Sequence, residues 1–456
     1  MLVRRLLRQN PTPGLALCQM PRGLRIIHPF VGDRNLTHFG GIFLIQRFCQ
    51  RLKLKWHLQK NVRFTQRRSR YHPIQLIQAI VYAVIVGISR LSKTSILQGN
   101  GAFLQIVGLR TFPYACSLRR FLKRVNLQML RDIDQVHDQL RHALFYVPRP
   151  RTSLLFDFDS SVLTVYGKLI EGAAVGYNPR KRGARSYHPI LGFESHNREF
   201  WHGCLRPGNV HTAAGSVEFL RACLAKVPPY VYRLRLRADA GFFGHKFVEA
   251  LEVAKIGYVI VARMVKPFKR KIATLDYHRF RKDWAVAEFH YQPFGWQQPH
   301  RFVVIRRPLP DKEEEQLSLF HTQRYAYQIF VTNLRLQAEK VWYFYRGRAV
   351  IELDIRELKE SYALAKIPTN RFLANQVYFS LLLLSYNIIN WFRRLCLPSK
   401  YRNATVETIR RDLLVVPARL VRTHNRNILR LPAEYVSADM LRGISKKIDA
   451  IKLKQS

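Results

Sequence analysis

The chain has 456 residues and a formal net charge of +46, from 76 Lys and Arg against 30 Asp and Glu side chains. Hydrophobic residues make up 48% of it and aromatic residues 12%, which excludes a disordered basic tail. Such an excess of cations needs a polyanion to neutralise it, so the expected partner is nucleic acid, with an anionic membrane surface as the rival. The length predicts about two to four domains or lobes.

The six cysteines are scattered and form no C-x2-C pair. Neither a disulfide framework nor a zinc site is indicated, which fits a reducing cytoplasm. The N-terminal segment includes several arginines, but Pro11 and Pro13 interrupt it, so the continuous apolar core of a signal peptide is missing. We therefore expect a cytoplasmic protein.

The first 150 residues contain only four acidic side chains, all of them aspartate. Apolar residues at helical spacing predict three helices here, over residues 74–88, 117–125 and 127–144. Ser117 is the expected N-cap of the second. Opposite the apolar stripe of that helix lie Arg119, Arg120 and Lys123. This composition suits a helix docked on DNA in a helix-turn-helix-like unit, and it suits the surface helix of any basic protein equally well.

From residue 153 the pattern changes to short β-prone runs separated by turns. Strands are predicted over 154–159, 162–166, 187–193, 231–238 and 258–263, with helices over 216–226 and 245–255. Further β-type runs occupy residues 265–340, and an apolar helix is expected near 372–394. Asparagines recur through that last helix, so we expect it to be buried against a sheet and not to span a membrane. The pattern alone indicates an α/β protein.

Three acidic residues of this region stand at strand positions or strand ends. A strand over 155–159 directs Asp157 and Asp159 to one face, and a carboxylate in so apolar a strand costs free energy unless its charge is compensated. Asp239 ends a second strand just before a glycine-containing loop, where α/β folds place functional groups. Asp159 and Asp239 also suit turn capping, because each stands close to a Ser or Gly.

A further set of candidate residues has the spacing Y-x2-R-x3-E-x6-K. On one helix at about 100° per residue its members share an arc of roughly 60°; they are Tyr345, Arg348, Glu352 and Lys359. One carboxylate among cations and a tyrosine suits a site that handles phosphates and a metal ion. The alternative is a solvated helix face with ion pairs between successive turns.

This spacing resembles the signature of insertion-sequence DDE transposases, the bacterial cut-and-paste enzymes. Further segments resemble the branch of that family with a D-x-D-[ST]-like first block; they are residues 156–167 (FDFDSSVLTVYG), 176–183, 186–193 and 237–243 (RADAGFF). The resemblance covers roughly residues 150–430. Three ordered blocks make it specific, whereas any one of them alone would be weak.

The resemblance implies an α/β fold with a ribonuclease H-like catalytic domain, a β-rich insertion and a mainly helical N-terminal DNA-binding region. The implied segments are a helical DNA-binding region over 1–150, the first part of the catalytic core over 151–264, the insertion over 265–340, the second part of the core over 341–396 and a basic extension with a β-hairpin over 397–456.

The resemblance also assigns the chemistry. Asp159, Asp239 and Glu352 would be the catalytic and metal-binding residues, holding two Mg²⁺ ions for in-line displacement at a phosphodiester, with Mn²⁺ able to substitute. Asp159 is chosen over Asp157 as the first member because Ser161 stands two positions after it, where the family has Ser or Thr. Asp157 stays the alternative.

Several other residues are expected to contact DNA. Tyr345, Arg348 and Lys359 would grip phosphates near the cut, and the loop Arg180, Lys181 and Arg182 is a candidate for contact with the DNA backbone. Trp284 and Trp296 could stack on a flipped base, although a structural role is the better expectation for each. His188 and His202 are expected to be ordinary structural histidines.

The implied function is that of a DDE transposase, which binds the inverted-repeat ends of a mobile element and catalyses Mg²⁺-dependent cleavage and strand transfer. Its partners would be double-stranded DNA, both transposon ends and target, and a second copy of the chain in a synaptic complex, with no membrane. It would act in the bacterial cytoplasm, associated with the nucleoid. The alternatives are a catalytically inactive DNA-binding protein derived from a transposase and a nuclease of the same fold.

Overall fold

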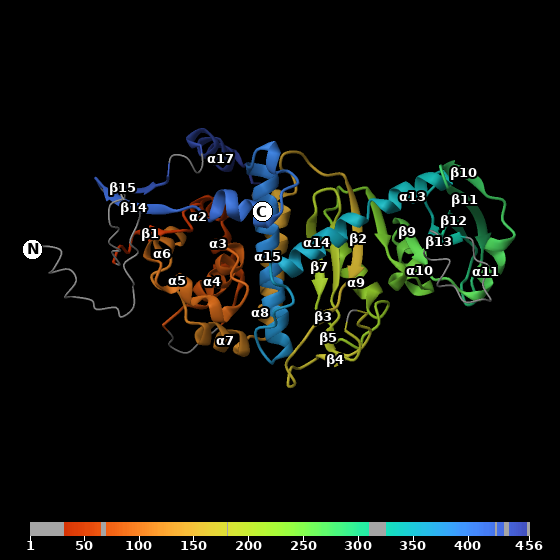
Figure 1. Cartoon of the computed structure of the whole chain (residues 1–456), viewed down its shortest axis with the longest axis horizontal. Helices are drawn as coiled ribbons and strands as arrows, with labels where there is room; N and C mark the ends of the chain where they lie inside the picture. Colours follow the sequence, from red (N-terminus) through yellow and green to blue (C-terminus); the bar gives the residue numbers. More distant parts are fainter. Residues whose placement is uncertain are drawn as a thin grey trace, which may run out of the picture.

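The computed structural model describes residues 32–64, 70–179, 181–309, 325–424, 426–432 and 437–453. The helices of the N-terminal region lie at one end and a large sheet at the other, and one long helix, α15 (Phe372–Cys396), stands between them (Figure 1). Because α15 contacts both parts, it fixes where the helices sit relative to the sheet.

The N-terminal helices are α2 (Ile42–Arg51), α3 (Leu54–Asn61), α4 (Pro73–Ile85), α5 (Ser95–Gln98), α6 (Gly101–Val107), α7 (Ala115–Arg124) and α8 (Leu127–Leu144). The side chain of Asn126 caps α8 by accepting from a backbone N–H of its first turn, so that helix begins where predicted. Helix α7 begins earlier than expected, with Tyr114 in the N-cap position. Ser117 as its N-cap was therefore wrong, because that residue already lies inside the first turn.

The large sheet has nine strands in the order β10-β11-β12-β13-β9-β8-β2-β6-β7. Five of its strands are β2 (Ser153–Ser160), β6 (Ile190–Glu194), β7 (Glu199–Cys204), which lies at the edge, β8 (Arg233–Ala238) and β9 (Gly257–Ala262). Strands β2, β6 and β7 form an antiparallel meander, whereas β8 and β9 run parallel to β2. The carboxyl ends of β2 and β8 therefore meet at one edge of the sheet.

Strands β10 (His278–Arg281), β11 (Trp284–Tyr291), β12 (His300–Pro308) and β13 (Tyr325–Thr332) continue the same sheet. They follow helix α11 (Lys266–Ala273), and β13 joins the sheet by pairing antiparallel with β9. The β-type runs expected in this segment are thus present, and they lie at the far end of the molecule from the N-terminal helices (Figure 1). Trp296 is buried against Phe243, and Trp284 packs on Trp342, as the structural expectation for both tryptophans requires.

Two strand predictions were wrong. The run 162–166 does not join the large sheet; its residues Leu163–Thr164 form β3, in a separate sheet of three strands ordered β3-β5-β4. The other two strands of this small sheet are β4 (Ala174–Val175) and β5 (Arg185–Tyr187). The run 187–193 divides into β5 and β6, because Pro189 has no N–H to donate to a continuous ladder. Strand β7, which completes the meander, was not predicted at all.

Helices cover both faces of the large sheet. On one face, Phe156 and Phe158 of β2 pack with residues of α9 (Ser216–Leu224) and α10 (His245–Val253). On the other lie α13 (Ala338–Arg346), whose Val341 packs on Val259 of β9, and α14 (Ala349–Glu360). The large sheet is thus covered by helices on both faces, as expected of a buried α/β sheet.

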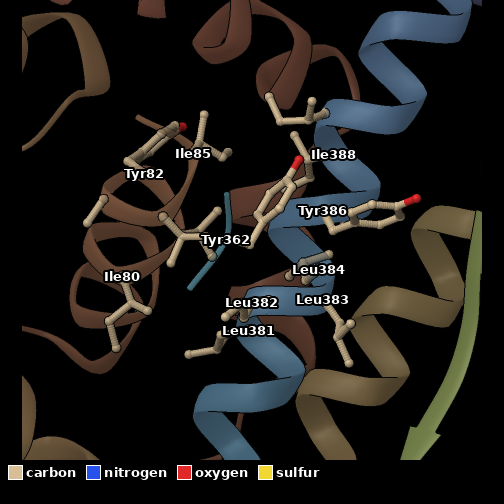
Figure 2. Close-up of a cluster of buried hydrophobic side chains, with 14 of the residues drawn as sticks. Ile80, Tyr82, Ile85, Tyr362, Leu381, Leu382, Leu383, Leu384, Tyr386 and Ile388 are labelled. Atoms are coloured by element: carbon tan, nitrogen blue, oxygen red, sulfur yellow. The ribbon is translucent and has the colours of Figure 1, made fainter. Parts of the chain in front are cut away.

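Helix α15 is long and apolar enough to cross a membrane by length and composition, and 78% of its most apolar window is buried inside the protein. Its apolar side chains, including Leu381, Leu384 and Ile388, pack toward α4, where Ile80 and Ile85 face them (Figure 2). The chain then forms a short helix α16 (Val406–Ile409), the predicted hairpin of β14 (Ala418–Thr423) and β15 (Arg426–Arg430), and α17 (Ala438–Ala450). Strand β14 also pairs with β1 (Leu36–Thr37).

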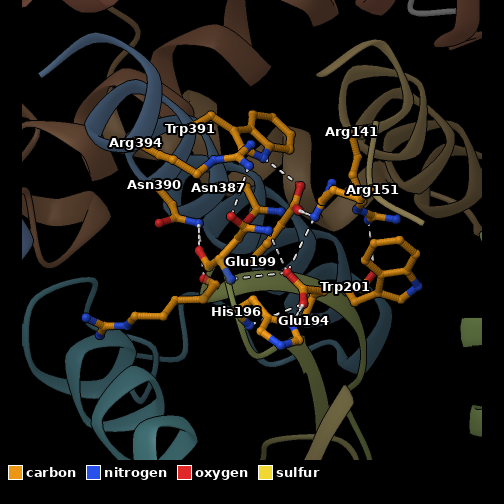
Figure 3. A network of polar contacts seen from close by, with 12 residues as sticks. Arg141, Arg151, Glu194, His196, Glu199, Trp201, Asn387, Asn390, Trp391 and Arg394 are labelled. Atoms are coloured by element: carbon orange, nitrogen blue, oxygen red, sulfur yellow. Dashed lines mark hydrogen bonds and ion pairs between the residues drawn. The ribbon is translucent and has the colours of Figure 1, made fainter. Parts of the chain in front are cut away.

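The polar side chains of α15 bind the meander. Asn387 donates to the carbonyl of Phe200 at 2.7 Å and accepts from its N–H at 3.0 Å, which attaches α15 to β7. The Trp391 indole donates to the buried carboxylate of Glu199 at 2.7 Å, and Arg151 completes the pairing of that carboxylate at 2.6 Å (Figure 3). The asparagines that argue against a membrane span thus have buried partners in this structure.

We predict that Asn387→Ala lowers the free energy of unfolding by about 2 kcal/mol, because both backbone groups of Phe200 lose a buried partner. Urea unfolding followed by circular dichroism measures the change. Asn427→Ala, on the exposed edge strand β15, is the control and should stay within about 0.5 kcal/mol of wild type. Equal stability of the two variants would contradict the attachment of α15 to β7 through Asn387.

Candidate functional site

Two aspartates meet at the carboxyl ends of β2 and β8. The parallel register pairs Phe158 with Ala238, so Asp159 and Asp239 are the next residues on neighbouring strands. Neighbouring strands lie about 4.8 Å apart, which brings the two carboxylates close together. The pKa of Asp159 reflects this: burial raises it to about 6, Arg348 opposes the rise, and Asp239 and Glu352 add to it.

Both aspartates also accept a backbone hydrogen bond, and that of Asp239 is the turn-capping contact that the sequence left open. An oxygen of Asp239 accepts from the Gly241 N–H at 2.9 Å, and one of Asp159 accepts from the Ser160 N–H at 2.9 Å. A Cβ at Gly241 would lie 2.8 Å from Thr212 and 3.0 Å from the Asp239 carboxylate, so the loop closes this tightly only around a glycine. Capping and clustering are therefore not exclusive, since a bond to one oxygen leaves the other lone pairs of each carboxylate available.

The segment with Tyr345, Arg348, Glu352 and Lys359 is not the single helix that its spacing predicted. Helix α13 ends at Arg346 and α14 begins at Ala349, with the backbone between them closing through a bond from the Arg348 N–H to the Tyr345 carbonyl. The junction between α13 and α14 contacts Arg237 of β8, which donates to the Phe344 carbonyl at 2.6 Å. A Cβ at Gly347 would lie 2.5 Å from that guanidinium. The close approach of Arg237 thus determines both the break and the glycine.

Arg348 links this segment to the aspartates. Its guanidinium lies 3.0 Å from Asp159 and 3.9 Å from Glu352, and it donates to the Phe158 carbonyl at 3.1 Å. The side chain of Arg348 is 7% exposed and that of Glu352 is 68% exposed. Arg348 thus lies between the two carboxylates, and in this structure it supplies the positive charge that the buried Asp159 requires.

Tyr345 lies against the same group. Its ring packs on Phe330 at a centroid distance of 4.9 Å, and burial raises its pKa to about 12, with Arg348 opposing the rise. The charges of Asp239 and Asp159 add to that rise in the pKa of Tyr345. The phenol therefore stays protonated at neutral pH and can donate a hydrogen bond.

Asp157, the alternative first member, has a different environment. Both of its oxygens accept from the Arg237 guanidinium, at 2.6 and 2.7 Å, and Arg237 also donates to the Ser195 hydroxyl at 2.7 Å. Asp157 is 1% exposed and Arg237 is 4% exposed. This bidentate pair is fully buried, which leaves the Asp157 oxygens little capacity for another ligand.

The carboxylates have the hard oxygen ligands that Mg²⁺ prefers. Among the residues that the structure describes, no three His, Cys, Asp or Glu side chains are gathered closely enough to hold a metal ion. The reason is geometric, since the Arg348 guanidinium occupies the space between Asp159 and Glu352. The donor set therefore fits a divalent cation chemically, through Asp159 and Asp239 first, and Glu352 joins it only if Arg348 moves.

The other expected DNA contacts are distributed around one large cavity. Arg119 and Lys359 line it together with Asp239. Lys181 donates to the hydroxyl of Tyr166, a lining residue, at 2.8 Å, and Arg182 is exposed on the same loop. Arg120 and Lys123 are exposed on α7 without lining the cavity, and Arg180 lies outside the described residues.

Sequence reasoning missed a group of neutral polar residues beside the aspartates. The Ser160 hydroxyl lies 3.0 Å from that of Thr212 and 3.1 Å from Nε2 of His188, whose Nδ1 lies 2.7 Å from the Val210 carbonyl. Since that carbonyl can only accept, Nδ1 carries the proton and Nε2 accepts from Ser160. Burial lowers the pKa of His188, which favours the same neutral form. The His-Pro pair within residues 186–193 was the signal for this group.

We predict that Arg348→Met lowers the free energy of unfolding by about 3 kcal/mol, because the buried Asp159 carboxylate loses its partner. Adding Asp159→Asn removes the stranded charge, so the double variant should be less destabilised than the sum of the two single changes. Urea unfolding of the four proteins gives the coupling energy. Arg356→Met, on an exposed position of α14, is the control, and strict additivity would refute the pairing.

Comparison with known families gives an extensive match. Residues 22–453 match the family model described as transposase DDE domain group 1. No curated protein matches the chain. Among solved structures, the cryo-EM structure of the piggyBac transposase synaptic complex with hairpin DNA is similar with a TM-score of 0.40 and 10% identity, covering 82% of this chain and 81% of that one.

A second structure is the Drosophila P element transposase strand transfer complex, with a TM-score of 0.22 and 13% identity. It covers 45% of this chain and 42% of that one. Both TM-scores are too low for either likeness to support an inference, whereas the family match spans almost the whole chain.

Proposed function

Because the chain belongs to the transposase DDE domain group 1 family, we propose that it binds the inverted-repeat ends of a mobile element and catalyses metal-dependent DNA cleavage and strand transfer. The family implies a nuclease or transposase activity and the use of a divalent metal ion. One observation carries the finer proposal. Asp159 and Asp239 occupy adjacent carboxyl ends of parallel strands, and α14 brings Glu352 to them through Arg348.

The proposed catalytic core is ribonuclease H-like and comprises residues 151–264 and 341–396. The strand order β7-β6-β2-β8-β9, an antiparallel meander followed by two parallel strands, supports this assignment. Residues 265–340 are then the insertion, 397–456 the basic extension and 1–150 the helical DNA-binding region. The basic helix α7 supports the assignment of residues 1–150 as a DNA-binding region, because Arg119, Arg120 and Lys123 are exposed on it.

The proposed metal ligands are Asp159, Asp239 and Glu352, holding two Mg²⁺ ions that Mn²⁺ can replace. Bound there, the ions would activate the attacking oxygen and stabilise the leaving oxygen of a phosphodiester. Arg348 has two tasks in this proposal. It positions Asp159 in the free protein, and its guanidinium would also suit a DNA phosphate beside the cut. Tyr345, whose phenol is protonated, would donate to the same strand, and Lys359 would hold a phosphate in the cavity.

The proposed working form is a homodimer in a synaptic complex, because both ends of an element must be processed together. It would act in the bacterial cytoplasm, on the nucleoid. Since the chain has 76 cationic and 30 anionic side chains, its affinity for duplex DNA should depend strongly on the salt concentration. The rival functions are a DNA-binding protein without catalysis and a nuclease without strand transfer.

We predict that the purified protein cleaves a fragment carrying its element's end only when Mg²⁺ or Mn²⁺ is added, and that Asp239→Ala and Glu352→Ala abolish cleavage while keeping DNA binding. Gel analysis of end-labelled DNA and a mobility-shift assay measure the two properties. Glu360→Ala, at the end of the same helix and outside the proposed metal ligands, should cleave normally. Binding without cleavage by wild type would leave only the non-catalytic alternative, and cleavage without joining to target DNA would indicate the nuclease.

A second prediction separates the two candidates for the first aspartate. Asp159→Asn also strands a buried arginine, Arg348, but its folded fraction should lose cleavage, because the change removes a proposed metal ligand. Asp157→Asn should lower the free energy of unfolding by about 3 kcal/mol, because it strands the buried Arg237, and its folded fraction should still cleave. Circular dichroism quantifies the folded fraction in each cleavage reaction. Loss of cleavage in well-folded Asp157→Asn, with activity kept in Asp159→Asn, would reverse the assignment.

A further inference from the structure

A cavity of about 1190 Å³ opens beside Asp239, between the small sheet, the N-terminal helices and the end of α14. Its walls come from segments far apart in the sequence, among them Arg90 and Arg119, Tyr166 and Tyr177, and Lys359. Pockets of about 300–1,000 Å³ enclose a drug-sized ligand, so this one can hold more than a single small molecule. It is connected to the proposed site through Ser160 and Asp239, which also line it.

Two exposed tyrosines form part of its wall. Tyr166 is 78% exposed and Tyr177 is 77% exposed, and each stands two residues past the end of a strand of the small sheet, β3 and β4 respectively. Both strands pair antiparallel with β5, so they run in the same direction. Tyr166 and Tyr177 therefore follow the carboxyl ends of strands at the same end of the small sheet. Aromatic rings exposed beside cations are the arrangement that stacks on nucleic-acid bases.

The backbone around these rings is held in place. Lys181 donates to the Tyr166 hydroxyl at 2.8 Å, and its ammonium lies 4.9 Å from the centre of that ring. Asn178, next to Tyr177, donates to the Thr164 hydroxyl of β3 at 3.2 Å, and a Cβ at Gly176 would lie 2.0 Å from the Gly208 carbonyl. The two rings are therefore presented by a fixed edge, which lowers the entropic cost of stacking.

Two groups of residues that line the cavity suit different parts of a nucleotide. The first group consists of the hydroxyls of Ser160 and Thr212, which the neutral His188 holds in place. These hydroxyls can form hydrogen bonds with the edge of a base, and being uncharged they do not repel a phosphate. Five cationic side chains also line the cavity: Arg90, Arg119, Arg263, Lys359 and Lys366. These suit the phosphates of the same strand.

We propose that this cavity binds an unpaired strand of DNA next to the cut, with its bases stacked on Tyr166 and Tyr177 and its phosphates on the surrounding cations. In a duplex each base face is covered by the next base, so a tyrosine can stack only on a nucleotide that has left the helix. The inference rests on the proposed function, since it assigns the strand to the DNA that this site cuts. Trp284 and Trp296 do not compete for this role, because they pack against Trp342 and Phe243.

The test measures binding without metal, so that cleavage does not interfere. A short oligothymidylate carrying one fluorescent pyrrolocytosine reports stacking by loss of fluorescence, and a duplex of the element's end is compared at the same salt concentration. Replacing Tyr166 and Tyr177 by Ala should weaken binding of the single strand about tenfold per ring and abolish the quenching. Binding of the duplex should fall far less.

Two controls keep the result interpretable. Tyr232→Ala removes a tyrosine that is 78% exposed at the opposite end of β8 and should leave single-strand binding unchanged. Phe at positions 166 and 177 keeps the rings and should restore both affinity and quenching. Circular dichroism checks that every variant is folded, which is expected because the replaced side chains are exposed.

Three results would overturn the inference: wild type that does not bind the single strand, variants that bind it normally, and variants that lose single-strand and duplex binding equally. None of these outcomes bears on metal-dependent cleavage of a duplex end, which tests the proposed function separately. If wild type instead binds and quenches the single strand through these tyrosines but never cleaves, the binding site holds and the enzymatic proposal fails.

Discussion

The arrangement of the whole molecule depends on the burial of one long helix on all sides. Helix α15 has apolar side chains around most of its circumference, so it must have protein on every face, and it contacts α4 and α8 as well as β7. Its polar groups fix its orientation, because Asn387 and Trp391 each have a particular partner on β7 and would bury an unsatisfied group in any other position. The N-terminal helices are thus held against the sheet, and Arg119 can line the same cavity as Asp239.

A second constraint is the balance of buried charge at the end of the sheet. Asp157 and Asp159 lie on the same face of β2, and each has its own arginine, Arg237 from the neighbouring strand and Arg348 from the start of α14. The two pairs differ in what they permit. The first is bidentate and enclosed, so it acts as structure, whereas the second opens toward Glu352 and can exchange its guanidinium for another cation. The same residue type at alternate strand positions therefore serves stability in one case and, in the proposed function, chemistry in the other.

The local sequence pattern was sufficient to predict several helices and strands. It was insufficient where contacts with residues distant in the sequence determine the structure. The range of α8 and the strands that carry Asp159 and Asp239 follow from apolar periodicity, which is a local property. Strand β7 was missed because its buried Glu199 looks unfavourable until Arg151 and Trp391, far away in sequence, neutralise it. The break between α13 and α14 likewise depends on an arginine of β8, which spacing along the helix does not reveal. Spacing along the chain was enough to select the candidate residues, but the position of Arg348 between two carboxylates required the tertiary structure.

In the proposed function, the site must attract a polyanion although carboxylates stand at its centre. Charges in water are screened beyond about 8 Å at physiological salt, so most of the 76 cationic side chains would bring DNA to the surface without acting at the cut itself. Within that distance the sign of the field depends on groups that share the cavity with Asp239, above all Lys359 and Arg119. Arg348 contributes little to it while paired with Asp159, since the two charges cancel at a distance. A divalent ion on the aspartates would end that cancellation and release one cation toward the phosphate, so metal binding and DNA binding should each strengthen the other.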